Sequence, residues 1–327
     1  MTQSTEATIW PIGVRLFNRP DYAEQLLYSL KKQTLEISDQ SLHFIIDGYL
    51  GSLDELRGRP DHTQRVANLI GTYFPEARIE QCATNLGIAQ TTFILQSQVF
   101  SLPNAEWAIF LEEDIVLAPE YIEALHHMIT LADDVSEVVK VAANQINLNY
   151  IQMPPKSDRR NFYLGQGTQA FAERREFFDK RKSLTEIYLS VISGRQYSDR
   201  DESEVFATLA EHGVFTIMGN NDAVHDRITM ALHGLHVVTS QKLLTDIGVA
   251  GETSYSYPAI PLPDTEISKV LETTKSDLLD ALEHLKMEAH IFEHKFFKDF
   301  WGGYLASVSG TLAFRVLRRK ALKLFKR

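Results

Sequence analysis

The sequence predicts an α/β protein in which a mostly parallel sheet is flanked by helices. The chain has 327 residues, and 44% of them are hydrophobic, enough to bury a large core. Through the first half, short apolar segments typical of strands alternate with longer segments of helical periodicity. Strands separated by helices require crossover connections, and these produce parallel pairing with both faces of the sheet covered.

The expected elements of the first half follow one another regularly. A helix should begin at Pro20, because proline is favoured at the first helical position. Asp61 is a candidate N-cap for a second helix, and the turn at Thr84-Asn85-Leu86-Gly87 precedes a third, over 88–100. A fourth helix is expected to start at Pro119. The four expected strands cover 12–17, Leu42–Ile46, 78–82 and 107–111.

The second half is less regular, and we expect it to end in a helical extension. Further strands are predicted over 138–143 and 236–239, and helices over the charged segment 174–211 and after Asn220. A Pro-rich link then leads to one long helix over 265–300. We therefore divide the chain into a main α/β domain, 1–260, and a helical extension, 261–327, with a basic amphipathic tail.

Polar residues follow each of the first four predicted strands. Because the carboxyl ends of parallel strands meet at one edge, where ligands of such sheets bind, these residues should cluster. They are Phe17-Asn18-Arg19, Asp47-Gly48, Thr84-Asn85 and Glu112-Glu113-Asp114.

The three acids after the fourth strand could bind a cation. Glu112 and Asp114 are two residues apart, so their side chains point the same way. Mg²⁺ and Mn²⁺ prefer a few carboxylate oxygens supplemented by substrate phosphates. The alternative is a solvated turn that caps the helix beginning at Pro119.

The order of these motifs resembles the nucleotide-sugar glycosyltransferases of the A-type (GT-A), Rossmann-like fold. The segment from Trp107 to Tyr121 is similar to their metal-binding Asp-X-Asp-type motif and to the Ala-Pro helix start of glycoprotein N-acetylglucosaminyltransferases. Leu244-Thr245-Asp246-Ile247-Gly248 is similar to a segment of related bacterial, family 2-like transferases. Asn221-Asp222 resembles the segment that carries the catalytic base in inverting members. The resemblance extends from about residue 9 to residue 252.

The resemblance implies a role for each residue. It implies a UDP-sugar donor, Mn²⁺ or Mg²⁺ held by Asp114, and Asp222 as the base that takes the proton of the acceptor hydroxyl. Asp226, one turn later, is the reserve candidate, and an ordinary N-cap is the other interpretation of Asp222. The nucleotide-binding positions are Phe17, Asn18, Arg19, Asp47, Asn85, Gly87, Glu112 and Glu113.

Composition and charge exclude several classes of protein. A formal net charge of -10 argues against a general nucleic-acid binder. Cys82 is the only cysteine, so no internal disulfide forms. No signal peptide or transmembrane run is recognisable, and we expect a cytoplasmic protein.

The tail, residues 311–327, begins at Thr311, ends at Arg327 and carries basic residues on an amphipathic pattern. It could lie on an anionic membrane surface or pack on the acidic protein. Membrane contact would favour a lipid-linked acceptor or a growing bacterial surface polysaccharide.

Two other functions remain open from the sequence. A sugar-nucleotide nucleotidyltransferase uses a related sheet and metal carboxylates, but the glycine-rich, basic loop it needs is missing after the first strand. A catalytically inactive, membrane-associated scaffold would keep its function after Asp114→Ala. The histidines His225, His233 and His236 are expected to be packing or surface residues.

Overall fold

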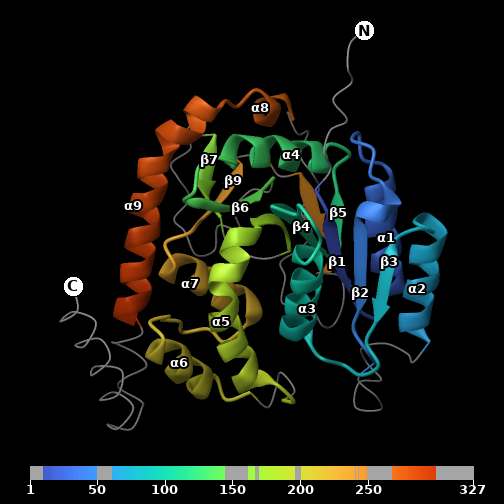
Figure 1. Cartoon of the computed structure of the whole chain (residues 1–327), viewed down its shortest axis with the longest axis horizontal. Helices are drawn as coiled ribbons and strands as arrows, with labels where there is room; N and C mark the ends of the chain where they lie inside the picture. Colours follow the sequence, from blue (N-terminus) through green and yellow to red (C-terminus); the bar gives the residue numbers. More distant parts are fainter. Residues whose placement is uncertain are drawn as a thin grey trace.

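The computed structural model describes residues 10–49, 61–143, 161–165, 169–195, 200–239, 241, 243–248 and 267–299. A large mixed sheet crosses the molecule, with helices on both faces (Figure 1). The predicted α/β class, a largely parallel sheet flanked by helices, is confirmed.

The sheet has eight strands in the order β3-β2-β1-β4-β8-β6-β9-β7. The pairs β1–β2, β1–β4, β2–β3 and β6–β9 are parallel, whereas β8 runs antiparallel to both β4 and β6, and β7 antiparallel to β9. The carboxyl ends of β1, β2, β3, β4, β6 and β9 therefore lie at the same edge. The strands are β1 Ile12–Leu16, β2 Leu42–Ile46, β3 Arg78–Gln81, β4 Trp107–Glu112, β6 Val138–Ala142, β7 Phe162–Leu164, β8 Ala170–Arg174 and β9 Leu235–Thr239.

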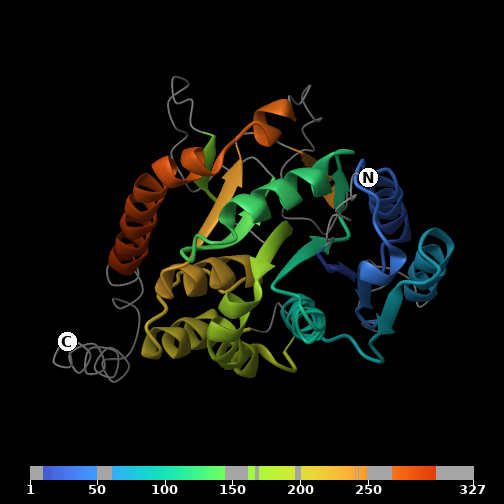
Figure 2. The same cartoon turned by 45° about the horizontal axis from the view of Figure 1, so that its top comes forward.

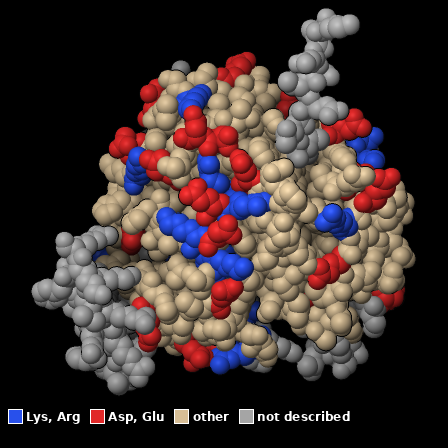
Figure 3. Space-filling view, viewed as in Figure 1, with Lys and Arg blue, Asp and Glu red and all other residues tan. Residues whose placement is uncertain are grey.

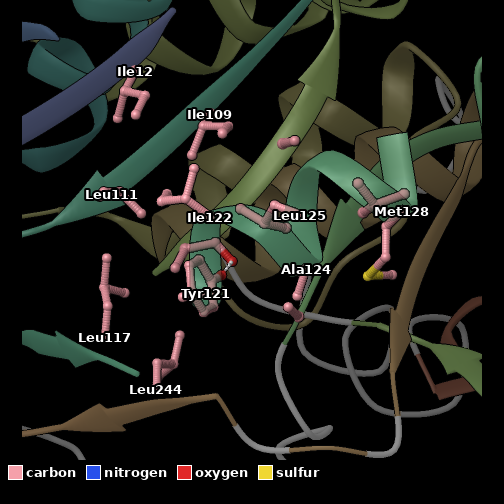
Figure 4. Packing of buried hydrophobic residues seen from close by; sticks show 14 of the residues in the cluster. Ile12, Ile109, Leu111, Leu117, Tyr121, Ile122, Ala124, Leu125, Met128 and Leu244 are labelled. Atoms are coloured by element: carbon pink, nitrogen blue, oxygen red, sulfur yellow. Dashed lines mark hydrogen bonds between the residues drawn. The ribbon is translucent and has the colours of Figure 1, made fainter. Parts of the chain in front are cut away.

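One face of the sheet is covered by α1 Pro20–Lys31, α2 His62–Tyr73, α4 Tyr121–Ala132 and α9 Lys275–Asp299. Figure 2 shows α4 lying across the sheet and α9 at the opposite end of the molecule from α1 and α2. Their apolar side chains meet those of alternate strand positions; Figure 4 shows Ile12 and Ile109 facing Ile122 and Leu125. In the same cluster the Tyr121 hydroxyl donates a hydrogen bond of 3.1 Å to the carbonyl of Ala170.

The other face is covered by α3 Ile88–Phe100, α5 Arg175–Ile192 and α7 Asn221–Ala231, with α6 Glu202–Glu211 packed against α5. Phe110 of β4 packs against Phe100 of α3 and against Phe171 of β8, with ring centroids 5.5 and 5.7 Å apart. Phe100 in turn stacks with Phe178 of α5 at 5.0 Å. A separate apolar cluster joins α5, α6 and α7. Buried polar side chains, among them Lys140 of β6 and Glu173 of β8, also lie on this face.

A second, two-stranded sheet closes the edge where the polar turns gather. It pairs β5 Ile115–Leu117 antiparallel with β10 Leu244–Asp246. Leu117 and Leu244 are partners in this pairing and lie side by side (Figure 4), and both belong to the main apolar cluster, so the hydrophobic core anchors this small sheet. The pairing brings the segment that follows β10 next to the acids that follow β4.

The helical extension packs against the main core wherever it is described. Leu278, Leu282 and Leu285 of α9 are buried in the same cluster as the sheet and α4. Lys286 adds an ion pair of 2.9 Å with Glu137. Residues 249–266 and 300–327 lie outside the described residues, so the division at residue 260 and the tail at 311–327 stay predictions.

Four local predictions need correction. The expected long helix is interrupted: α8 covers Ser268–Leu271, and α9 starts only at Lys275, where the Asp277 carboxylate accepts a hydrogen bond from the Thr274 backbone. The helix after Pro119 begins at Tyr121. Asp61 occupies the N-cap position of α2 but makes no capping hydrogen bond. The strands β5, β7, β8 and β10 were not expected: β5, β7 and β10 have three residues each, and β8 ends at Arg174, where the charged helical segment was expected to begin.

Candidate functional site

Arg19 links the end of β1 to the acids that follow β4. Its Nε donates to Glu113 Oε1 at 2.5 Å, and its Nη2 donates to Asp114 Oδ2 at 3.1 Å. Glu113, whose side chain is 3% exposed, also accepts a 2.7 Å hydrogen bond from the backbone N–H of Phe17. Burial works to lower the pKa of Arg19, but the charges of Glu113 and Asp114 outweigh it and raise that pKa. Arg19 therefore stays charged and holds the two turns together.

Asp114 has one carboxylate oxygen that is not used. Its Oδ1 is buried and has no hydrogen-bond partner among the described residues. An unpaired, buried carboxylate oxygen costs about 1–3 kcal/mol, more when it is charged, unless something binds it. The Asp114 side chain as a whole is 16% exposed.

This oxygen fits the predicted cation. Within the described ranges, no group of three or more His, Cys, Asp or Glu side chains could by itself hold a metal ion. Mg²⁺ is commonly bound through one or two carboxylates together with substrate phosphates, so a full protein cage is not required. Asp114 would be the residue that holds the ion, and Arg19 would lie beside its phosphate ligands.

Glu112 lies beside Asp114 and pairs with Arg15, which is opposite it in the β1–β4 register. Arg15 Nη2 and Glu112 Oε1 are 2.9 Å apart. Burial raises the pKa of Glu112 to about 7; Arg15 opposes that shift, and the charges of Asp222 and Asp114 add to it. Asp222 is therefore within electrostatic range of Glu112, although the two residues are far apart in sequence.

Asp47 holds the turn that follows β3. Its Oδ1 accepts hydrogen bonds from the backbone N–H groups of Gly48 (2.9 Å) and Leu86 (2.8 Å). Its Oδ2 accepts from the backbone N–H of Gly87 (2.9 Å) and from Asn85 Nδ2 (3.1 Å). These four donors occupy most of the carboxylate's accepting capacity. Asp47 thus positions the turn; its direct contact with a uracil ring stays a prediction.

The same turn depends on two glycines. Gly87 has a φ of +82° at the start of α3, a conformation that side chains rarely adopt. A Cβ on Gly48 would lie 2.3 Å from the carbonyl carbon of Thr84. Asn85 Nδ2 also donates to the carbonyl of Gly48 at 2.9 Å, which joins the ends of β2 and β3.

Asp222 lies in the first turn of α7 and is not its N-cap. Asn220 is the N-cap, since its side chain accepts a 2.8 Å hydrogen bond from the backbone N–H of Ala223. The Asp222 side chain is exposed, whereas Asp226, one turn later, is 7% exposed. Because the Asp222 side chain is exposed, it could contact a substrate that approaches α7.

The structure thus brings most of the predicted residues to one edge of the sheet. Phe17 and Arg19 contact the acids after β4. Asn18 is 3% exposed, and its backbone carbonyl oxygen lies 3.0 Å from His62 Nδ1. Sequence reasoning missed Arg15 and the buried polar residues Lys140, Glu173 and Arg181. The signal that could have found Arg15 and Lys140 is a basic residue inside an otherwise apolar strand.

Charged residues elsewhere on the surface are mixed in sign. In Figure 3, Lys and Arg side chains alternate with Asp and Glu in a band across the middle of the face shown. Lys286 and Glu137 form one such pair of opposite charges, 2.9 Å apart. Among the helices that the structure describes, none has the length and apolar character needed to cross a bilayer.

Comparisons with known proteins give distant matches to solved structures. No family model matches the chain, and no curated protein matches it significantly. The 1-349 segment of S. aureus TarS in complex with UDP is 12% identical, with a TM-score of 0.40 over 68% of this chain and 70% of that one. The same segment in complex with UDP-GlcNAc is 11% identical, with a TM-score of 0.40 over 68% of this chain and 71% of that one.

GalNAc-T7 with UDP, GalNAc and Mn²⁺ is 12% identical, with a TM-score of 0.43 over 71% of this chain and 42% of that one. Only 43% of a longer TarS structure is covered. TarS is a GT-A glycosyltransferase, the class that the sequence motifs resemble. At identities of 11–12% and TM-scores of 0.40–0.43, no function is assigned from these matches.

Proposed function

We propose that this chain is a metal-dependent, inverting glycosyltransferase that moves a sugar from a UDP-sugar to an acceptor hydroxyl. The observation that carries the proposal is the buried, unpartnered Oδ1 of Asp114 in the described part of the chain, next to Arg19 at the carboxyl edge of the sheet. A cation binder and a fixed guanidinium side by side suit a diphosphate group.

The donor would bind where β1 and β4 end. Asp114 would hold Mn²⁺ or Mg²⁺, which when bound neutralises the charge of the diphosphate leaving group. Arg19 is fixed by Glu113 and Asp114, so its remaining N–H groups can bind a phosphate oxygen without losing further side-chain freedom. The turn held by Asp47 borders the same edge and would support the nucleoside.

The acceptor would approach from the side of α7. Asp222 would take the proton of the acceptor hydroxyl as its oxygen forms a bond to the anomeric carbon. The bond between that carbon and the UDP oxygen breaks, and its electron pair leaves with UDP. Attack from the face opposite UDP inverts the anomeric centre.

The acceptor class is the least constrained part of the proposal. The basic, amphipathic pattern of 311–327 supports a chain that works peripherally at an anionic membrane in the cytoplasm, on a lipid-linked acceptor or a growing bacterial polysaccharide. UDP-hexose and UDP-N-acetylhexosamine are both suitable donors for the test.

Calorimetry of the full chain with UDP, with and without Mn²⁺, tests the donor site, and UDP release from UDP-sugars tests the activity. We expect Mn²⁺ to strengthen UDP binding in the parent and in Asp179→Asn, an exposed control on α5. Asp114→Asn should lose that strengthening. A folded chain that neither binds UDP nor releases it from any UDP-sugar would contradict the proposal. Pyrophosphate release from a nucleoside triphosphate would instead indicate a nucleotidyltransferase.

A further inference from the structure

Two arginines of the first strand and the turn after it lie among the three acids that follow β4. Arg15 Nη2 is 2.9 Å from Glu112 Oε1. Arg19 Nε is 2.5 Å from Glu113 Oε1, and its Nη2 is 3.1 Å from Asp114 Oδ2. Each of the three carboxylates therefore has a guanidinium within hydrogen-bonding distance. With all five side chains ionised, the cluster carries a single net negative charge.

These contacts leave few carboxylate oxygens for a cation. Both oxygens of Glu113 are used, Oε1 by Arg19 and Oε2 by the backbone N–H of Phe17. Asp114 Oδ2 accepts from Arg19, so Oδ1 is the one oxygen of these two acids that has no hydrogen-bond partner among the described residues. Hard divalent cations favour several oxygen ligands. One carboxylate oxygen beside a guanidinium is therefore a poor site for a cation that arrives alone.

Arg19 has other contacts besides Asp114. Its Nε donates to Glu113, and its Cζ lies 5.0 Å from the centroid of the Tyr22 ring. The Glu113 side chain is 3% exposed, so its ion pair with Arg19 is shielded from water. Because Nε and Nη2 bind different acids, Nη2 can exchange its partner while Nε stays on Glu113.

A diphosphate group offers such an exchange. Phosphate oxygens accept strong, charge-assisted hydrogen bonds from a guanidinium. They also supply the oxygen ligands that Mg²⁺ and Mn²⁺ need in addition to one or two carboxylates. If Arg19 Nη2 passes to a phosphate oxygen, Asp114 Oδ2 is released for the cation. Neither the cation nor the diphosphate alone supplies both parts of this exchange.

We propose that Arg19 makes cation binding depend on the diphosphate: the site takes a divalent cation together with a nucleoside diphosphate and has little affinity for the cation alone. The inference rests on the proposed function for the nature of the ligand. The competition between Arg19 and the cation for Asp114 involves neither nucleotide nor turnover, so it can be measured by itself.

Binding of Mn²⁺ without nucleotide tests the competition. The full chain is titrated with Mn²⁺, and the electron paramagnetic resonance signal of the free aqueous ion gives the bound fraction. A hydrogen bond to a charged group corresponds to roughly ten- to a hundredfold in an equilibrium constant. We expect the double variant Arg19→Met/Glu113→Gln to bind Mn²⁺ at least about tenfold more tightly than the parent, because Asp114 then has no competing guanidinium.

The double variant is chosen to keep charge and folding constant. It removes one positive and one negative charge, so the net charge of the chain stays that of the parent, and no unpaired charge is left in the buried site of Glu113. The new amide can still accept the hydrogen bond from the Phe17 backbone. Adding Asp114→Asn should abolish the gain in affinity. Should the double variant fail to fold, Arg19→Met alone is compared with Lys32→Met, which removes an exposed positive charge at the other end of α1.

UDP gives the second readout. In the parent, UDP should tighten Mn²⁺ binding about tenfold or more, and in the double variant by a smaller factor, because Mn²⁺ alone already binds there. Calorimetry of UDP with and without Mn²⁺ should return the same two factors, since the coupling between two ligands is reciprocal.

Three results would overturn the proposal. They are equal Mn²⁺ affinities of the parent and the double variant without nucleotide, a gain in affinity that survives Asp114→Asn, and an equal effect of UDP in the two chains. A chain that does not bind UDP contradicts the proposed function instead, since the titration with Mn²⁺ alone still decides whether Arg19 competes for Asp114.

Discussion

The backbone of Gly248 lies directly against the carboxylate of Asp114. A Cβ on Gly248 would be 2.7 Å from Asp114 Oδ2, and the backbone N–H of Ile247 donates to the carbonyl of Asp114 at 2.8 Å. Ile247 and Gly248, which follow β10, thus fix the position of the candidate metal ligand Asp114.

Gly248→Ala should therefore move Asp114. We expect Mn²⁺-dependent UDP binding to weaken about tenfold or more. The free energy of unfolding should fall by about 1–3 kcal/mol, because the added methyl group overpacks the site. Titration calorimetry with Mn²⁺ checks the first effect and urea unfolding the second. Gly71→Ala, at an open position of α2 with no heavy atom within 4 Å of the new Cβ, is the control. Equal UDP affinities in both variants would contradict a role for Gly248 in the site.

Asp222→Asn separates proton transfer from donor binding. Loss of a general base typically lowers the rate about 10²–10⁴-fold, so kcat for transfer should fall by that range while UDP affinity stays the same. Asp226→Asn should reduce kcat much less, because Asp226 is buried. Initial rates of UDP release with acceptor, and calorimetry with UDP, provide the two readouts. If Asp222→Asn retained turnover and Asp226→Asn lost it, the base would be Asp226.

Asp47→Ala should destabilise the fold as well as the site. It leaves the backbone N–H groups of Gly48, Leu86 and Gly87 without their acceptor. Each unsatisfied buried group costs about 1–3 kcal/mol, and with some relaxation we expect a loss of about 2–4 kcal/mol in the free energy of unfolding. Asp61→Ala, which removes a carboxylate without a capping hydrogen bond, should cost less than about 0.5 kcal/mol. Urea denaturation of both variants tests the difference.

Buried histidine makes the fold sensitive to mild acid. Burial lowers the pKa of His236 to about 3 in the folded chain, against about 6.5 in the unfolded chain. Between these pH values only the unfolded chain binds a proton at His236. The contribution of the buried, neutral His236 to the free energy of unfolding therefore falls as the pH falls below about 6.5. The limiting slope is about 1.4 kcal/mol per pH unit.

His236→Phe isolates that contribution. Glu112, whose pKa is raised to about 7, acts in the opposite direction, so the comparison is made between variants. From pH 7.5 to pH 5.5, the parent should lose about 1 kcal/mol more than His236→Phe in urea unfolding. His290→Gln, on the exposed side of α9, should behave as the parent does. An identical acid response in all three chains would show that His236 is charged in the folded state.

If the tail, residues 311–327, binds membranes, that binding should depend on the charge of the lipid. Deletion of 311–327 should abolish co-sedimentation with vesicles that contain anionic lipid, because each basic residue contributes about 1 kcal/mol near such a surface. Vesicles of neutral lipid should bind neither form. Equal sedimentation of the two forms with anionic vesicles would exclude a membrane role for the tail.

The edge of the sheet was predictable because its residues come from local patterns. Helical periodicity gave α3 with the bounds observed, and the polar residues after each apolar strand identified Arg19 and Asp114. What the sequence could not give is the pairing of residues far apart in the chain. The antiparallel strand β8, which separates β4 from β6, has five residues and no signal of its own. A buried row of three side chains, Glu173, Lys140 and His236, exists only through that insertion.

The capping question shows a second limit of the sequence. Asn220, Asn221 and Asp222 all favour an N-cap, and only the backbone geometry shows that Asn220 takes that position. The role of Asp47 has the same origin. A loop aspartate could equally be solvated or bind a ligand, and its four donors become visible only when the ends of β2 and β3 are side by side.

The pairing of β5 with β10 has a consequence for biosynthesis. During translation Asp114 is synthesised long before β10. The nascent chain therefore carries the Asp114 carboxylate before the β5–β10 pairing that positions it can form. Contacts between distant parts of a chain also form slowly during folding. The position of the Asp114 carboxylate should therefore be fixed late, after most of the polypeptide has emerged, and a chain that stops before β10 would lack the proposed donor site.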